Sequence, residues 1–473
     1  MRCNPACRFP QIGNDSLRQS AQVDHLPHLH RGRAGEAEQV RAELFDAPRA
    51  RLHLIDAVLM LGIFYGWWIV AVAFLTHCVT TGIVFYSFGV FLTVLTEAFG
   101  WSRAEVSWGF SLVAVCGAVY APFVGRIVDR RGPRLSQIIG ALALAGGFAL
   151  LRGIESRLAF YLVMGGLVSL GATALGPLPS NTAVANWFVR RRGRALGLAT
   201  AGISMGGVIF VPLTQYLVEH IGWRNAFGAL ALIIVAVVIP PVAWLMVRRP
   251  EDLGLCPDGG ERGGATGLDL ELEIERSLAA PEAMRQRNFW LITVSFALTV
   301  LGLSATLIHQ VSFLRDRGIP AGAAAWTLGA TAGVGVVGKL GFGYLLDNFD
   351  QRHVIVWCFG LQALGLALLM ATFNVWTLAL FVVVYGFAMG GNATLQATIL
   401  GDCFGRLYYG AIAGRMQPFI VIGQAIGTPL VGAIRDSGGS YIPAFAMILV
   451  LNVVAMACIA RLRLPGKTKG PPG

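Results

Sequence analysis

Two sets of six apolar runs, separated by one polar stretch, constrain the fold of this chain more than any other feature. The first set lies near residues 60–92, 104–127, 135–153, 157–185, 193–219 and 225–247. The second set lies near residues 288–314, 320–346, 353–373, 375–400, 409–434 and 441–460. A helix of about 20 apolar residues spans the hydrocarbon core of a bilayer. The pattern therefore predicts an all-α membrane protein with twelve transmembrane helices in two six-helix bundles.

Composition also indicates a chain that lies in lipid. Hydrophobic residues make up 55% of the 473 residues and charged residues only 13%, whereas soluble proteins carry about 25% charged residues. The net charge of +11 comes largely from arginines in short loops, so we expect the lipid bilayer and no nucleic acid as a partner. The eight cysteines form no Cys-x-x-Cys pair, and we interpret them as small core residues without a disulfide framework or metal site. No catalytic or phosphate-binding motif occurs in a suitable context, so we expect neither an enzyme nor a cofactor.

The hairpin between the second and third runs carries an unusual density of charge. Residues 125–134 hold four arginines and one aspartate. Gly132 and Pro133 predict the turn, because proline cannot continue a helix and glycine tolerates a left-handed backbone. We expect Asp129 to be a counter-ion among the loop arginines. The other loops of the same parity are also rich in arginine, which predicts that they and both termini are cytoplasmic in a multi-pass protein of the cytoplasmic (inner) membrane.

The two halves repeat weakly. Gly125 and Asp129 have counterparts in Gly343 and Asp347, 218 residues later. We therefore predict an N-terminal bundle over residues 56–247, a flexible cytoplasmic linker over 248–286 and a C-terminal bundle over 287–463. Residues 464–473 form a cytoplasmic tail in this interpretation, and residues 1–55 form a disordered tail or reflect a wrongly assigned start.

The hairpin pattern Gly-x-x-x-Asp-Arg-x-Gly-x-Arg resembles the signature loop of the major facilitator superfamily. It comprises Gly125, Asp129, Arg130, Gly132 and Arg134. Residues 65–68, 87–91, 99–105 and 187–197 further resemble the monocarboxylate porter and oxalate/formate antiporter branch, in its bacterial type. The resemblance implies the major facilitator fold, with substrate bound between two halves near the membrane midplane. It implies a monomeric secondary transporter of small organic anions that works by alternating access.

One cation within an apolar run is the main candidate for binding such an anion. Lys339 lies in the 320–346 run, and intramembrane ionisable residues are usually functional. It falls four residues before Gly343, where the monocarboxylate family has its substrate-binding arginine. The alternative, that its long stem lets it reach the membrane interface, stays open. Further candidate substrate-binding residues are Arg415, His309, Tyr86, Asn181 and Tyr385.

Two departures from the family pattern concern proton coupling. Animal monocarboxylate porters carry a lysine where this chain has Tyr86 and an aspartate where it has Gly335. Symport with protons, exchange and uniport therefore all stay open, and His77 and His309 are the only weak substitutes for the missing pair. Two alternative functions also stay open at this point: an exporter of drugs or cations with the same fold, and a membrane sensor that does not transport.

Overall fold

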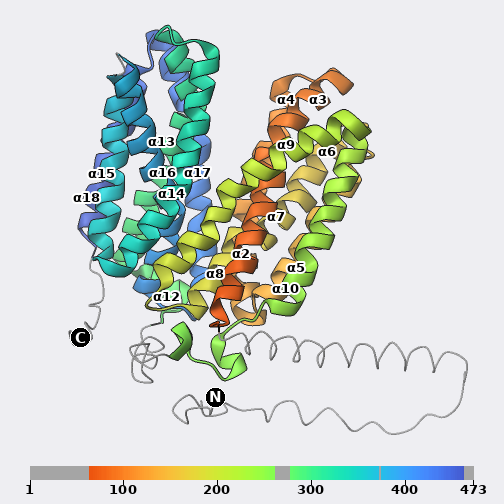
Figure 1. Cartoon of the computed structure of the whole chain (residues 1–473), viewed down its shortest axis with the longest axis vertical. Helices are drawn as coiled ribbons and strands as arrows, with labels where there is room; N and C mark the ends of the chain where they lie inside the picture. The colour runs from red at the N-terminus through yellow and green to blue at the C-terminus, as the bar shows by residue number, and fades with distance from the viewer. Residues whose placement is uncertain (1–62, 261–276, 372–373, 463–473) are drawn as a thin grey trace, which may run out of the picture.

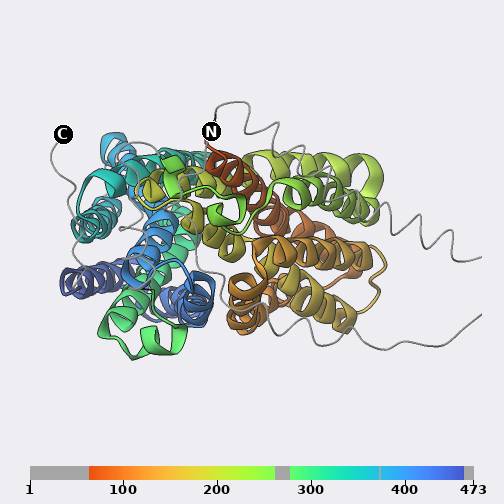
Figure 2. The ribbon, with the colours of Figure 1, turned by 90° about the horizontal axis from the view of Figure 1, so that it is seen from below.

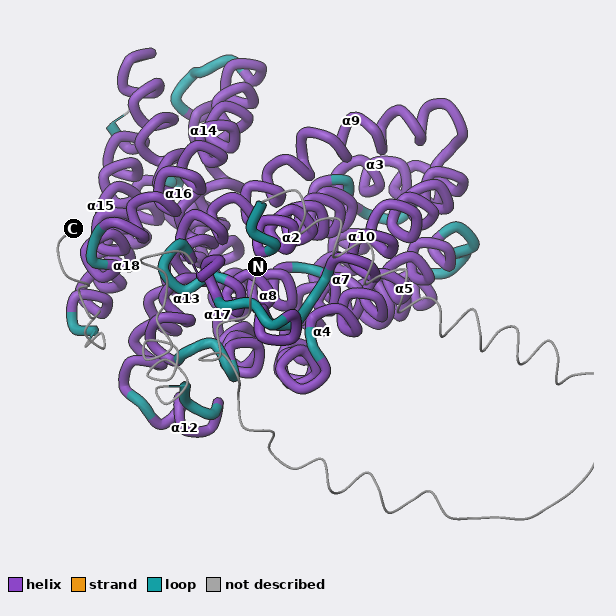
Figure 3. The backbone as a smooth tube through the Cα atoms, turned by 60° about the horizontal axis from the view of Figure 1, so that its bottom comes forward, coloured by secondary structure: helices purple, strands orange, loops and turns teal. Residues whose placement is uncertain are grey.

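The computed structural model describes residues 63–260, 277–371 and 374–462, and every regular element in these ranges is helical (Figure 1). Coloured by secondary structure, the same residues show only helices and the loops between them (Figure 3). The tails expected at residues 1–55 and 464–473 lie outside these ranges, as does the 261–276 part of the linker.

The first bundle contains the elements up to residue 245. They are α2 (Gly66–Thr81), η2 (Gly82–Tyr86), α3 (Phe88–Phe99), α4 (Arg103–Arg131), α5 (Pro133–Leu151), α6 (Arg157–Val163), η3 (Met164–Val168), α7 (Ser169–Leu175), α8 (Pro177–Trp187), α9 (Arg192–Ile233), η4 (Ile234–Val238) and α10 (Ile239–Leu245). Local sequence sets several of the boundaries. Ser102 and Glu105 form a capping box at the start of α4, and prolines occupy the first turns of α5 and α8, where a missing N–H is tolerated.

Eleven helical stretches of the described residues are long and apolar enough to cross a membrane. One of them, Arg192–Leu245, has 54 residues, which is too long for one crossing. The chain reverses within it at Gly222, whose backbone takes φ 75° and ψ 157°. A side chain at this position would be strained, because L-residues avoid this region. Counting its two arms separately gives the twelve crossings that the apolar runs predict.

The second bundle follows the linker. Its elements are α12 (Ala280–Arg285), α13 (Arg287–Asp316), α14 (Ala321–Asn348), α15 (Gln351–Met370), α16 (Val375–Phe404), α17 (Tyr409–Gly438) and α18 (Ile442–Ala460). Here each crossing is a single uninterrupted helix. Asn374 caps α16 and Asp350 caps α15 with their side chains, as residues with short polar side chains do at helix starts.

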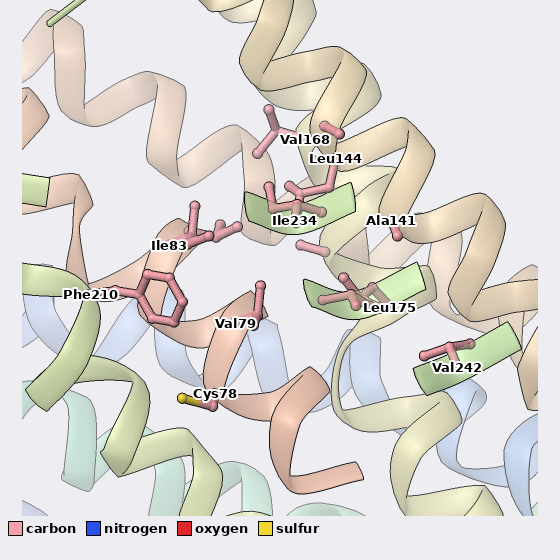
Figure 4. Close-up of a cluster of buried hydrophobic side chains, with 14 of the residues drawn as sticks. Cys78, Val79, Ile83, Ala141, Leu144, Val168, Leu175, Phe210, Ile234 and Val242 are labelled. Carbon is pink, nitrogen blue, oxygen red and sulfur yellow. The ribbon is translucent and has the colours of Figure 1, made fainter. Parts of the chain in front are cut away.

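Each bundle has an apolar core of its own. In the first bundle, side chains from α2, α5, α9 and α10 meet around Val79, Leu144 and Phe210 (Figure 4). In the second bundle, one cluster gathers around Phe296, Phe359 and Ile399, and another around Phe381 and Phe445. The pattern of two cores supports two six-helix bundles as the architecture.

The bundles lie side by side and touch mainly along two helix pairs. Figure 2 shows the two groups of helices next to each other, and in Figure 1 they separate towards the end that carries α3 and α6. The touching pairs are α4 with α17 and α9 with α14. We call the end that carries Asp129 and Asp347 the clamped end.

The linker is attached to the clamped end over its described part. The Asp258 carboxylate accepts hydrogen bonds from the backbone N–H groups of residues 189–191, at 2.9, 2.9 and 3.2 Å. Residues 250–260 therefore do not behave as the free strap expected from their composition. Cys256 is disulfide-bonded, which the interpretation of the cysteines as core residues did not include.

Candidate functional site

Glycines let the two bundles approach closely at the clamped end. A Cβ added to Gly125 of α4 would overlap the carbonyl oxygen of Gly410 in α17, and one added to Gly193 of α9 would overlap that of Gly343 in α14. Gly414 meets the backbone of α4 in the same way. Backbones this close exclude both water and side chains. The clamped end is therefore closed in this conformation.

Two carboxylates cross between the bundles at these contacts. Asp129, at the end of α4, accepts hydrogen bonds from the N–H groups of Gly410 (2.9 Å) and Ala411 (2.6 Å) at the start of α17. Asp347, at the end of α14, accepts hydrogen bonds from Gly193 (2.7 Å) and Arg194 (3.2 Å) at the start of α9. A carboxylate at a helix N-terminus pairs with unsatisfied N–H groups and with the positive end of the helix dipole. Each bundle thus caps a helix of the other.

The role of Asp129 differs from the expectation of a counter-ion to the loop arginines. The Arg248 guanidinium is close, but it donates to the backbone carbonyls of Asp129 and Arg130. The carboxylate itself is turned to the other bundle, because the paired N–H groups at a helix start satisfy it better than solvated guanidinium groups.

Two further ion pairs join the halves at the clamped end. The buried Arg192 of α9 pairs with Asp402 of α16, which also accepts a hydrogen bond from Gln351. The buried Arg406 pairs with Glu251 of the linker and donates to the carbonyl of Asn186 at 3.0 Å. We interpreted Arg192 and Arg406 only as charges that orient the chain. Their partners come from distant parts of the sequence, and no spacing indicates them.

A cavity of about 310 Å³ lies between the bundles beyond the clamped end. Side chains of α4, α7 and α8 form its wall on one bundle, and side chains of α16 and α17 form the facing wall. Along α17 it extends from Tyr409, the first residue of the helix, to Gln424, midway along it. The residues that line it include no Asp, Glu, Lys, Arg or His. The cavity is therefore a neutral chamber that reaches the middle of the membrane span.

Lys339 lies behind the wall of this cavity, at the contact between α14 and α9. Its side chain is buried, and its Nζ donates a 2.7 Å hydrogen bond to the hydroxyl of Ser204 on the other bundle. Ile203, the neighbour of Ser204, lines the cavity. Within the described ranges, no carboxylate lies within ion-pair distance of this ammonium group. The lysine is a buried cation with a neutral partner, and it does not extend to the membrane interface.

His77 of α2 is hydrogen-bonded to a residue of the cavity lining. Its Nε2 shares a 3.1 Å hydrogen bond with the side-chain oxygen of Asn181, which lines the cavity. For that bond Nε2 must carry the hydrogen, which leaves Nδ1 as an acceptor. Among the described residues, Nδ1 is buried without a hydrogen-bond partner. From the sequence we expected Lys339 and Asn181 to be substrate contacts, and named His77 only as a weak substitute for the missing proton-coupling pair.

The remaining candidates lie away from the cavity lining. His309 bonds the carbonyl of Thr428 at 3.0 Å, and Tyr385 is buried in the second bundle against Phe381. Tyr86 is an exposed side chain near Gly207. Arg415 lies beside Arg126, and its Nη1 is buried without a partner in the described part of the chain. Their assignment as substrate contacts stays a prediction.

Comparison with known proteins places these features in a family. The family model of the Major Facilitator Superfamily matches residues 72–340 and 298–473 of this chain. Monocarboxylate transporter 13 of Bos taurus is 29% identical over 389 residues, which cover 81% of this chain and 86% of the relative. Monocarboxylate transporter 4 of Rattus norvegicus is 26% identical over 393 residues, covering 80% and 81%.

A solved structure shows the same fold at lower identity. The proton:xylose symporter XylE, bound to 6-bromo-6-deoxy-D-glucose, superposes with a TM-score of 0.65 and 14% identity over 83% of this chain and 94% of that chain. The two relatives are animal proteins, so the expectation of a bacterial type is not borne out. The match to the family over most of the sequence, together with the twelve crossings in two bundles, shows that the chain belongs to the Major Facilitator Superfamily.

Proposed function

We propose that the chain is a secondary transporter that moves a small organic anion of the monocarboxylate type across a membrane. The observation that carries the proposal is Lys339, a buried cation at the bundle interface that donates a hydrogen bond to a neutral hydroxyl. An uncompensated charge in a low-dielectric site attracts an opposite charge strongly. The names of the relatives, monocarboxylate transporters 13 and 4, point to the same class of substrate.

In this proposal the substrate carboxylate replaces Ser204 as the partner of the Lys339 ammonium. Asn181 lines the cavity and contacts His77, so its carboxamide is in reach of an anion that approaches from the cavity. Lysine supplies a point charge and not the planar fork of arginine. The site therefore favours one carboxylate oxygen at a time. The remaining candidates, Arg415, His309, Tyr86 and Tyr385, are not part of the site proposed here.

Alternating access requires that the clamped end opens while the other end closes. The contacts that must break are those of Asp129 with α17 and of Asp347 with α9. We propose that the hairpin residues Gly125, Asp129, Arg130, Gly132 and Arg134, with Asp347, form the conformational loop set of this movement. The arginine-rich loops at the clamped end support a cytoplasmic location for that end and for both termini, in the cytoplasmic membrane. One chain contains the whole cavity, which supports a monomer as the working unit.

The alternative functions have less support. An exporter of cations needs an acidic group in its binding cavity, and the lining residues include none. A sensor without transport does not need an uncompensated buried cation, which is unfavourable for stability. The proposal contains no catalytic step.

Uptake of labelled carboxylates into proteoliposomes tests the proposal. We expect the wild-type protein to take up at least one monocarboxylate, and the Lys339→Ala variant to lose at least about tenfold in kcat/KM, equivalent to about 1.4 kcal/mol. Lys339→Arg keeps the charge and retains part of the activity. Arg435→Ala is a control, because Arg435 pairs with Asp316 in an exposed position away from the cavity.

The outcomes separate the parts of the proposal. Transport by Lys339→Ala at the wild-type rate excludes Lys339 as the anion ligand. Transport of organic cations alone excludes the substrate class. A parallel set of vesicles with a pH gradient shows whether protons accompany the anion, because only a coupled carrier accumulates the anion against its own gradient.

A further inference from the structure

One wall of the cavity carries carboxamide side chains, which can form hydrogen bonds with uncharged polar groups of a ligand. Gln396 of α16 and Gln417 and Gln424 of α17 line it, and all three belong to the second bundle. None of the three side chains has a hydrogen bond to another residue in the part of the chain that the structure describes. No substrate contact was assigned to them by sequence reasoning.

The spacing of residues along α17 explains why Gln417 and Gln424 both face the cavity. Ala413, Gln417, Val421 and Gln424 follow each other at intervals of four, four and three residues, and all line the cavity. This spacing puts them on one face of an α-helix. Polar side chains in a membrane segment are unfavourable unless they find partners. An amide that faces an open chamber finds its partner in water or in a ligand.

The facing wall is different. On α4 it consists of small apolar residues that include Ala114, Gly117 and Ala118. The hydroxyl of Thr173 also lies there, but it already donates to the carbonyl of Ser169 at 2.8 Å. A ligand in the cavity thus meets the apolar side chains of α4 together with Thr80, Thr81 and Asn181 on the first bundle, and the three glutamine carboxamides on the second.

The size of the cavity bears on the length of the ligand. A volume of about 310 Å³ corresponds to roughly ten water molecules at ~30 Å³ each. It falls at the lower end of the range of small-molecule sites, ~300–1,000 Å³. An acid of two or three carbons therefore fills only part of this chamber.

We propose that the substrate is a monocarboxylate with an uncharged polar body, such as a polyhydroxy acid or an N-acyl amino acid, and that Gln396, Gln417 and Gln424 bind that body. This inference rests on the proposed function, because it assumes that the carboxylate is held near Lys339. The carboxamides donate and accept hydrogen bonds, so they bind hydroxyl and amide groups equally. The absence of charged lining residues excludes a second carboxylate or an ammonium group from the body of the ligand, because burying such a charge without a partner is unfavourable.

The test compares anions that share a carboxylate and differ in the body. Gluconate and N-acetylalanine have polar uncharged bodies, and hexanoate has the six carbons of gluconate without its hydroxyl groups. Each is titrated against the purified full-length protein, and Kd is obtained from the ligand-dependent rise in melting temperature. We expect at least one of the two polar anions to bind at least about tenfold more tightly than hexanoate, because a site that makes hydrogen bonds rejects an analogue without them.

Substitution of the amides then reduces the preference for the polar anion. Gln417→Leu and Gln424→Leu each weaken binding of the polar anion by about 2- to 12-fold, the range for one lost hydrogen bond, and leave binding of hexanoate unchanged or tighter. Gln215→Leu is the matched control, because Gln215 is an exposed amide of α9 bonded to Glu219 at 2.6 Å. It leaves all three affinities unchanged.

The outcomes that overturn the inference differ from those that overturn the proposed function. Hexanoate binding as tightly as both polar anions, or an unchanged preference in both glutamine variants, refutes the inference and leaves a carboxylate transporter in place. If no anion raises the melting temperature and labelled gluconate does not enter proteoliposomes, the proposed function falls together with the inference.

Discussion

Two buried cations of this protein have opposite environments. Arg192 has the carboxylate of Asp402 as a partner, whereas Lys339 donates to the hydroxyl of Ser204 and to no carboxylate among the residues that the structure describes. Burial of a charge without a counter-charge is unfavourable, and a buried ion pair is disrupted severely when one partner is removed. The two residues therefore predict opposite effects of substitution on stability.

We expect Lys339→Met to leave the melting temperature unchanged or to raise it. The substitution removes an uncompensated charge and keeps an unbranched apolar side chain of similar length. Thermal unfolding in detergent, followed by tryptophan fluorescence, measures the change. A decrease of several degrees contradicts the assignment of Lys339 as a residue kept for function at the expense of stability.

We expect Asp402→Asn to destabilise the protein by about 3–5 kcal/mol, the typical effect of leaving one member of a buried pair alone. The guanidinium of Arg192 then keeps its hydrogen bonds to the carbonyls of Phe188 and Ala185 and loses the carboxylate of Asp402. Asp436→Asn, at an exposed position near the end of α17, is the control. The same unfolding experiment compares both variants, and equal melting temperatures contradict the prediction.

At the scale of helices, the contact between α4 and α17 depends on the absence of side chains. We expect Gly125→Val to abolish closure of the clamped end, because its side chain would overlap the backbone of Gly410. Gly146→Val is the matched control, since nothing lies within 4 Å of a Cβ at Gly146 of α5. Transport in proteoliposomes measures the effect, with loss expected only for Gly125→Val.

The sequence predicts the helical crossings of this protein, but not which of their faces meet. The twelve apolar runs fixed the number of crossings, because the length of a span depends only on the bilayer. The gap between the 193–219 and 225–247 runs predicted the reversal at Gly222, but not that the helical stretch continues on both sides of this one residue, because a lone glycine gives no signal of its backbone angles. Lys339 and Asn181 were found as isolated polar groups in apolar runs. The glutamines were missed, because their position in a cavity depends on which faces of α16 and α17 meet the other bundle.

For the whole molecule, the clamp is symmetric: each half supplies one carboxylate and one helix start. We expect Asp129→Ala and Asp347→Ala each to shift the equilibrium towards opening of the clamped end by about 1 kcal/mol, the usual value of a helix cap, and the double variant to shift it by about the sum, because the sites are separate. Spin labels at Arg131 and His353, exposed on the two bundles, report the separation as a distance distribution. An unchanged distribution in the double variant contradicts the prediction.

The attachment of the linker offers a way to monitor the conformational change experimentally. Glu251 belongs to the linker, whereas its partner Arg406 contacts both the linker and the carbonyl of Asn186 on the first bundle. Movement of one half relative to the other must stretch or break one of these two contacts. A fluorophore attached to the water-facing side of residues 250–254 would consequently change its emission once per transport cycle. A label that stays outside the lipid would thus be enough to follow the cycle.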